Sequence, residues 1–256
     1  MKNLTTRLVA VTGAFAITLG AAACSKSDTP TTTAGGSSSA GATAGSSASA
    51  PATTDTGAAP KAADILDKAK SNALAATSGA FAGDVDQNGK KITIDFKGTS
   101  DGKTADIAIE MEGDGKARVI SVADGVFIQG DATFWKKQGA PAKVQNAGDK
   151  FIKAPSSAGA MTESLSLKSF LEKAFGAVTP AQVSATVTSQ AVGGVDCWVL
   201  TDKKGAGEGA LYVSKDKLEV VRFTGSKSSP GQLDFSQWNA DLGIKAPAAS
   251  QVMSLS

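Results

Sequence analysis

The sequence predicts an α+β fold in which the antiparallel strands of one long sheet share a core with two short helices. Apolar residues recur at helical spacing over residues 62–77 and again over 166–176. Between and after these segments, apolar and polar residues alternate with a period of two and are interrupted by Gly- and Asp-containing turns. The segment before residue 61 is rich in small polar residues and has too few large apolar ones to form a core.

Residues 1–23 have the organisation of a secretory signal peptide. A basic head precedes an apolar run over residues 8–17, and Ala21-Ala22-Ala23 supplies small residues before a cleavage site. The run is too short to span a bilayer as a helix, which needs about 20 residues. Because a cysteine follows, the segment resembles the lipobox of bacterial lipoproteins. The resemblance implies a lipid on Cys24 that anchors the protein to the membrane, outside the cytoplasm.

Ordinary secretion is the alternative for this signal. Ala21 stands where lipoboxes usually carry Leu, and Ala21-Ala22-Ala23 also satisfies the Ala-x-Ala rule of the general signal peptidase. The protein would then be released with Cys24 as its first residue.

Residues 24–60 form a Ser-, Thr-, Ala- and Gly-rich segment that we interpret as a disordered tether. A flexible coil of this length has a root-mean-square reach of about 30–36 Å, enough to lift a folded domain clear of lipid headgroups. The remaining residues, 61–256, have the length of one domain. Removing Lys2 and Arg7 with the signal leaves a net charge of zero, and no basic run is present, so we expect no nucleic acid partner.

Motifs for catalysis and cofactor binding are missing. The chain has no His, which excludes a Ser-His-Asp triad and a histidine metal site. Gly205–Gly209 precedes a strand rather than a helix, so we interpret it as a hairpin loop and not as a dinucleotide motif. Asp84 with Asp86, and Asp106 with Glu110, fall on the polar faces of predicted strands, where solvated carboxylates are the simpler interpretation. We expect no enzyme, no metal and no cofactor.

Cys197 lies in the apolar segment Val195–Leu200, which we predict to be a strand. A lipidated Cys24 cannot form a disulfide with it, and no His is available as a catalytic base. The sequence therefore predicts a buried free thiol that acts as a small apolar core residue.

The first helix, over residues 62–77, ends at Ser78-Gly79, and a meander of antiparallel strands follows. Gln87-Asn88-Gly89 predicts a tight hairpin turn, because Asn-Gly tolerates the positive φ of a type I′ loop. The strands of this meander are predicted around residues 81–85, 92–97, 104–111, 117–122 and 126–129.

Residues 132–160 have no clear period and are predicted to be irregular. The second helix, over 166–176, follows. A second meander then completes the chain, with strands predicted over residues 181–190, 195–202, 210–213, 218–224 and 232–235.

Two stretches and the overall layout resemble a known protein group. Val126–Lys137 reads as a strand, a short turn and an aromatic residue before Lys, and Gly194–Leu200 is followed by Leu211–Val213 and Leu218–Arg222. With the lipobox, the tether and the order of helices and meanders, they resemble the actinobacterial lipoproteins LppX, LprG, LprA and LprF, whose fold is similar to that of the carriers LolA and LolB. The resemblance implies a curved half-barrel closed by short helices, with an apolar cavity for acyl chains.

The apolar faces of the first three predicted strands are the candidate lining of that cavity. We expect it to contain Phe81, Val85, Ile92, Ile94, Phe96, Ile107, Ile109 and Met111. The resemblance implies a cell-envelope lipoprotein whose partner is an acylated lipid or lipoglycan, with palmitate as a typical chain. A tethered sensor or interaction module with a filled core is the alternative, and an enzyme using Asp, Glu, Lys or Ser is a third one. The sequence indicates no particular protein partner.

Overall fold

The structure is a computed structural model that describes residues 60–87, 89–155, 165–176 and 178–254. The predicted signal peptide, Cys24 and the predicted tether up to residue 59 lie outside the described residues. In the part that is described, no helix combines the length and the apolar character needed to cross a membrane.

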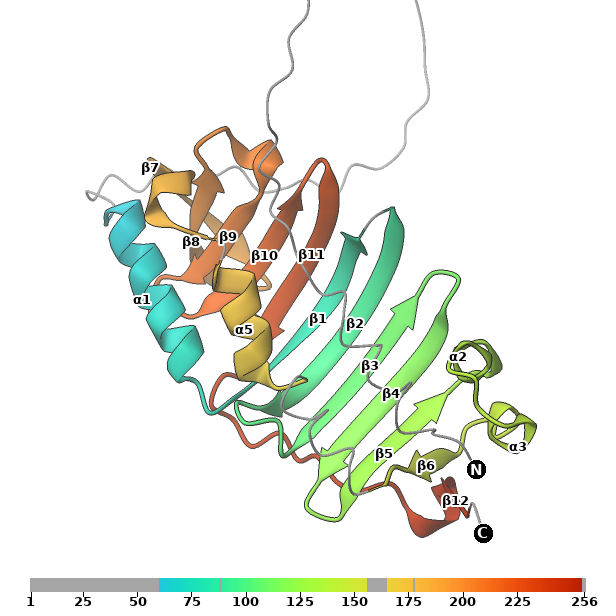
Figure 1. Cartoon of the computed structure of the whole chain (residues 1–256). Helices are drawn as coiled ribbons and strands as arrows, with labels where there is room; N and C mark the ends of the chain where they lie inside the picture. The colour runs from blue at the N-terminus through green and yellow to red at the C-terminus, as the bar shows by residue number, and fades with distance from the viewer. Residues whose placement is uncertain (1–59, 88, 156–164, 177, 255–256) are drawn as a thin grey trace, which may run out of the picture.

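The strands form one 12-stranded sheet in the order β12-β6-β5-β4-β3-β2-β1-β11-β10-β9-β8-β7. Figure 1 shows an open, strongly curved sheet with short helices on its concave side, which confirms the expected α+β half-barrel. Neighbouring strands are antiparallel except at one edge, where β12 (Val252–Met253) runs parallel to β6 (Phe151–Lys153). The sheet is therefore mixed rather than purely antiparallel, because the C-terminal segment returns to pair with its far edge.

The first half of the chain follows the predicted order closely. Helix α1 covers Ala62–Ala75, two residues shorter than predicted, and the predicted hairpin turn separates the first two strands. The strands are β1 (Ser78–Gln87), β2 (Lys90–Thr99), β3 (Ala105–Met111), β4 (Gly115–Val122) and β5 (Gly125–Gly130).

The second half begins with helix α5 (Leu167–Gly176), within one residue of its prediction. A 3-10 turn at Pro180–Gln182 leads into the second meander, and another at Ala206–Glu208 lies in the predicted glycine-rich loop. The strands are β7 (Val183–Val192), β8 (Val195–Asp202), β9 (Ala210–Ser214), β10 (Val220–Ser226) and β11 (Ser229–Ser236). A last 3-10 turn, Ala249–Gln251, precedes β12.

The prediction that residues 132–160 are irregular was wrong for residues 132–153, while residues 156–160 lie outside the described residues. Helix α2 (Ala132–Lys137), helix α3 (Ala142–Gln145) and strand β6 lie there. Asp131 caps α2, since its Oδ1 accepts a hydrogen bond from Phe134 N at 2.7 Å. Elements this short are stabilised by caps and packing, and they contain too few residues to show a hydrophobic period.

Strands β1 and β11 join the two meanders into one sheet. Phe81 pairs with Phe235 and Gly83 pairs with Leu233 in this antiparallel ladder. Residues from opposite ends of the folded region thus lie side by side, and their apolar faces form one continuous surface.

Helices pack on the concave face, here called the inner face. Figure 1 shows α1 over the second meander, α5 over the strands where the two meanders join, and α2 and α3 beside β4–β6. The middle of the inner face, on β3, has no labelled helix over it. On the opposite, outer face, the C-terminal segment covers the end of the sheet, where Ile244 and Val252 pack against Ile120, Phe127 and Phe151.

Candidate functional site

Strand register places apolar residues in continuous rows across the inner face. Directly paired residues share a face of a sheet, so the ladder partners can be followed from strand to strand. The middle row runs from β7 to β5 through Val187, Leu200, Leu211, Phe223, Leu233, Gly83, Ile94, Ile109, Ala117 and Gly130.

A second row runs parallel to the first and is aromatic at its centre. The Phe81 ring stacks on the Phe96 ring at 4.7 Å between centroids, and on the Phe170 ring of α5 at 4.1 Å. Trp238 stacks on Phe235 at 5.8 Å. The row consists of Phe235, Phe81, Phe96, Ile107, Val119, Ile128, Ile152 and Met253.

A third, shorter row contains Gly231, Val85, Ile92, Met111 and Gly115. It ends at α2, as the middle row does at Gly130. A Cβ on Gly130 would lie 2.3 Å from the Phe134 ring, and one on Gly115 would lie 2.6 Å from Phe134 N. Glycine at these two positions therefore lets α2 approach the inner face closely.

The structure brings all eight predicted cavity residues together on this face. They occupy neighbouring positions in the three rows, on β1, β2 and β3. Phe81, Ile92, Ile94, Phe96 and Ile107 are buried, whereas Val85, Ile109 and Met111 are partly buried against the same core. Their role in lipid binding stays a prediction.

Sequence reasoning missed the second meander's share of the face. Leu200, Leu211, Phe223 and Leu233 continue the middle row, and Leu66 of α1 packs into the same core. The alternation of apolar and polar residues in these strands was visible in the sequence, as clear as in the first meander. The sequence did not reveal the β1–β11 pairing that places both meanders on a single sheet.

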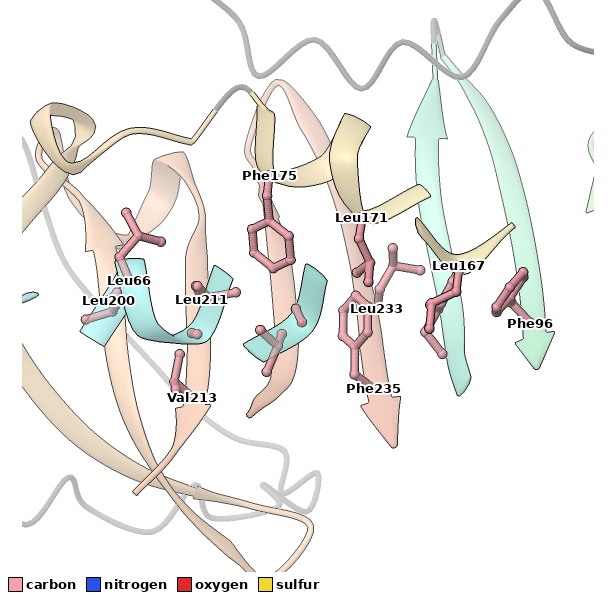
Figure 2. Close-up of a cluster of buried hydrophobic side chains, with 14 of the residues drawn as sticks. Leu66, Phe96, Leu167, Leu171, Phe175, Leu200, Leu211, Val213, Leu233 and Phe235 are labelled. Carbon is pink, nitrogen blue, oxygen red and sulfur yellow. The ribbon is translucent and has the colours of Figure 1, made fainter. Parts of the chain in front are cut away.

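Cavities lie between the helices and the second meander. One of about 90 Å³ has an apolar wall of Leu66, Leu200, Leu211 and Phe223 and a polar rim that includes Lys204. Another, of about 10 Å³, lies between α5 and β9–β11 and shares Leu211 and Phe223 with the first. Figure 2 shows Leu171 of α5 pointing toward Leu233 and Phe235, and Phe175 lines the smaller cavity together with these two residues. Both volumes are far below the 300–1,000 Å³ of typical ligand pockets, so the core beneath α5 is filled.

The buried indole of Trp135 stands apart from this apolar packing. Trp135 of α2 is 5 % exposed, and its Nε1 has no hydrogen-bond partner among the described residues. A buried donor without a partner costs about 1–3 kcal/mol. The inner face thus carries one unused polar group at its α2 end.

The predicted acid pairs lie on the outer face, where Asp84, Asp106 and Glu110 pair with cations and Asp86 accepts a hydrogen bond from Gly89 N. Asp106 accepts two hydrogen bonds from the Arg118 guanidinium, at 2.8 and 2.6 Å, and Glu110 lies 2.9 Å from Lys116 Nζ. Hydrogen bonds from Thr93 and then from Lys91 lower the pKa of Asp84 below its usual value. In the described ranges, no group of three or more His, Cys, Asp or Glu side chains could hold a metal ion. The geometry matches solvated cross-strand ion pairs.

Cys197 is buried, as predicted, and forms no disulfide within the described residues. Its side chain is 0 % exposed and donates to Val195 O at 3.3 Å. Burial raises the pKa of the Cys197 thiol to about 11, and the nearby Asp196 carboxylate adds to the rise. A thiol held neutral in this way is a poor nucleophile.

No protein-family model and no curated protein matches the sequence. The lipoprotein LppX of Mycobacterium tuberculosis is a similar solved structure, 12 % identical, covering 72 % of this chain and 98 % of that one with a TM-score of 0.44. LprF from Mycobacterium bovis is 11 % identical, and the match covers 73 % of this chain and 97 % of LprF with a TM-score of 0.45. MucB is 14 % identical, and the match covers 75 % of this chain and 62 % of MucB with a TM-score of 0.32. The first two belong to the group that the sequence resembles. Likeness at this level does not bear on what the chain binds.

Proposed function

We propose that the protein is a cell-envelope lipoprotein that binds an acylated lipid or lipoglycan non-covalently along its inner face and carries or presents it. The observation that carries this proposal is the set of apolar rows, which extend beyond the helices that pack on them. Val187 and Gly130 mark the breadth of the middle row. An acyl chain laid across β3 would contact Ile109 and Met111, which are only partly buried.

The driving force would be removal of the acyl chain from water. Each buried CH₂ contributes about 0.8 kcal/mol, so one chain of ordinary length supplies enough free energy for tight binding. The 90 Å³ and 10 Å³ cavities could not hold such a chain while α5 packs as it does, so a chain that extended from β3 into the core beneath α5 would require α5 to move away from Leu233 and Phe235.

Trp135 would bear on the ligand's polar end only if α2 moved on binding, because its Nε1 is enclosed by protein in this structure. An ester or hydroxyl oxygen that then reached Nε1 would remove the cost of leaving this donor unpaired. No catalytic step is part of the proposal.

The filled core beneath α5 favours a second candidate. If α5 stays packed on Leu233 and Phe235, the domain would act as a sensor or interaction module without cargo. Anchorage through Cys24, outside the cytoplasm, would be the same for both candidates.

Replacement of Ile107 by Trp tests the lipid proposal. Ile107 lies in the aromatic row on the inner face of β3, whereas its neighbour Ala108 lies on the outer face of the same strand. Protein purified from its native envelope is analysed by native mass spectrometry for mass that organic solvent removes, and melting is compared after delipidation. We expect lipid on the parent protein and on A108W, and little or none on I107W.

In a filled core, I107W would overpack the face and cost about 1–3 kcal/mol of stability. A clear fall in melting temperature, combined with a parent protein that never carries lipid, would refute the carrier and favour the sensor.

A further inference from the structure

We infer that a separate pocket, at the C-terminal end of α1, binds a neutral polyhydroxylated group such as a sugar ring. This inference does not depend on lipid binding to the inner face. The pocket has a volume of about 220 Å³. Its lining includes Asn72 of α1, Lys217 and Glu219 before β10, and Trp238 and Asn239 after β11.

Unusual backbone conformations cluster around this pocket. Among the described residues other than glycine, positive φ occurs at Leu218 (53°), Gln237 (55°) and Asn239 (57°). All three are pocket-lining residues or their direct neighbours. Positive φ is an outlier for a bulky residue such as Leu, and residues in sparsely populated conformations concentrate at binding sites, where the surrounding structure holds them.

Hydrogen bonds between distant segments hold these conformations in place. Asn72 Nδ2 donates to Lys217 O at 3.0 Å and to Leu218 O at 3.1 Å. Asn239 Oδ1 accepts from Thr77 N at 2.9 Å. Trp238 Nε1 donates to Val220 O at 2.9 Å, so its ring is fixed beside the opening. The pocket is therefore preorganised by three segments that are far apart in the sequence.

The remaining polar groups suit hydroxyl groups. Asn72 Oδ1 and Asn239 Nδ2 are not used in the hydrogen bonds above, which leaves one acceptor and one donor. The Lys217 ammonium and the Glu219 carboxylate form no ion pair with any described residue, and they bring one charge of each sign. A hydroxyl both donates and accepts, so a polyol can use all four groups, whereas a charged ligand would meet one like charge.

The probes are methyl β-D-glucoside and octyl β-D-glucoside, titrated to about 10 mM into the full-length protein, which covers millimolar affinities. Chemical shifts of the Trp238 indole and of the Asn72 and Asn239 side-chain amides report binding at the pocket. Equal affinities would indicate recognition of a free sugar, and tighter binding of the octyl compound would indicate a lipid headgroup. Either result supports the site.

Variants of the two charged residues identify the pocket. E219A and K217A should each weaken binding by about tenfold, because each removes one charge-assisted hydrogen bond. The matched control is D216A, because Asp216 is an exposed neighbour that does not line the pocket. This variant should bind the glucosides with the affinity of the parent protein.

The inference is overturned if neither glucoside moves the reporting signals. It is also overturned if E219A and K217A bind as the parent does, or if inorganic phosphate moves the same signals more strongly than the glucosides. None of these results would affect the test at Ile107, so the two proposals can fail separately.

Discussion

Gly83 of β1 lies so close to Gln232 of β11 that a Cβ at residue 83 would stand 1.9 Å from the Gln232 carbonyl oxygen. Gly83 also has a φ of 152°, in a region that is essentially restricted to glycine. It occupies the middle of the central row, at the junction of the two meanders. The absence of a side chain therefore allows the two halves of the inner face to join.

We expect Gly83→Ala to destabilise the protein by about 3 kcal/mol or more, since the methyl group meets backbone that has to move, in addition to the strain of the conformation. Chemical denaturation measures the change. Gly89→Ala is the control, because Gly89 also has positive φ (74°) but a Cβ there would have nothing within 4 Å. It should cost only about 1–2 kcal/mol, the strain of the left-handed conformation. Equal costs for the two variants would contradict a steric requirement at residue 83.

Gln237→Gly should stabilise the protein. Gln237 is exposed and has a φ of 55°, which costs a residue with a side chain about 1–2 kcal/mol. Glycine removes that strain but adds about 0.5–1 kcal/mol of unfolded-state entropy, so the expected net gain is about 0.5–1 kcal/mol in denaturant unfolding. Asn239→Gly serves as the comparison, since it loses the hydrogen bond from Thr77 N and should gain less. A destabilised Gln237→Gly would show that residue 237 is not strained.

Stability should fall at alkaline pH through Cys197. The pKa of its thiol rises from 9.0 to about 11 on folding, so the folded state holds the proton more tightly than the unfolded one. The resulting contribution is complete below pH 9, declines between pH 9 and 11, and is lost above pH 11. Lysines titrate in the same window, so the measurement is the difference between the parent and Cys197→Ala in unfolding free energy against pH. A constant difference from pH 8 to pH 11 would argue against the raised pKa.

The same thiol should react slowly at pH 8. Thiol reagents should label Cys197 only after denaturation, because its side chain is 0 % exposed and its pKa is raised. A Cys24→Ser background leaves one thiol to follow. Labelling of the native protein as fast as of the denatured protein would contradict its burial.

Cys24→Ser should release the protein from the membrane or leave it unprocessed. The prediction rests on the signal that ends at Ala23 and on the low-complexity tether that follows. Cell fractionation followed by mass spectrometry of the N-terminus gives the result. A processed Cys24→Ser variant that still fractionates with membranes would show that residue 24 is not the anchor.

Local patterns in the sequence were sufficient for the regular elements. The period-two alternation around Ile92, Ile94, Ile107 and Ile109 predicted both the strands and the face that these residues share, because side chains alternate across a strand. The same reasoning predicted α1, α5 and the burial of Cys197. This reasoning did not predict the short helices α2 and α3. Helix α2 is defined by a cap at Asp131 and by glycines at 115 and 130, and α3 has only four residues, too few to show a period.

Tertiary structure decided how the two meanders combine. The pairing of Phe81 with Phe235 joins residues far apart in the sequence, and no local pattern specifies which strand edges meet. The same holds for the parallel pairing of β12 with β6, and for the pocket that Asn72 forms with Glu219 and Trp238. Hydrophobic periodicity determines which side of each strand is buried, whereas the choice of neighbours depends on packing over the whole sheet, which only the folded chain contains.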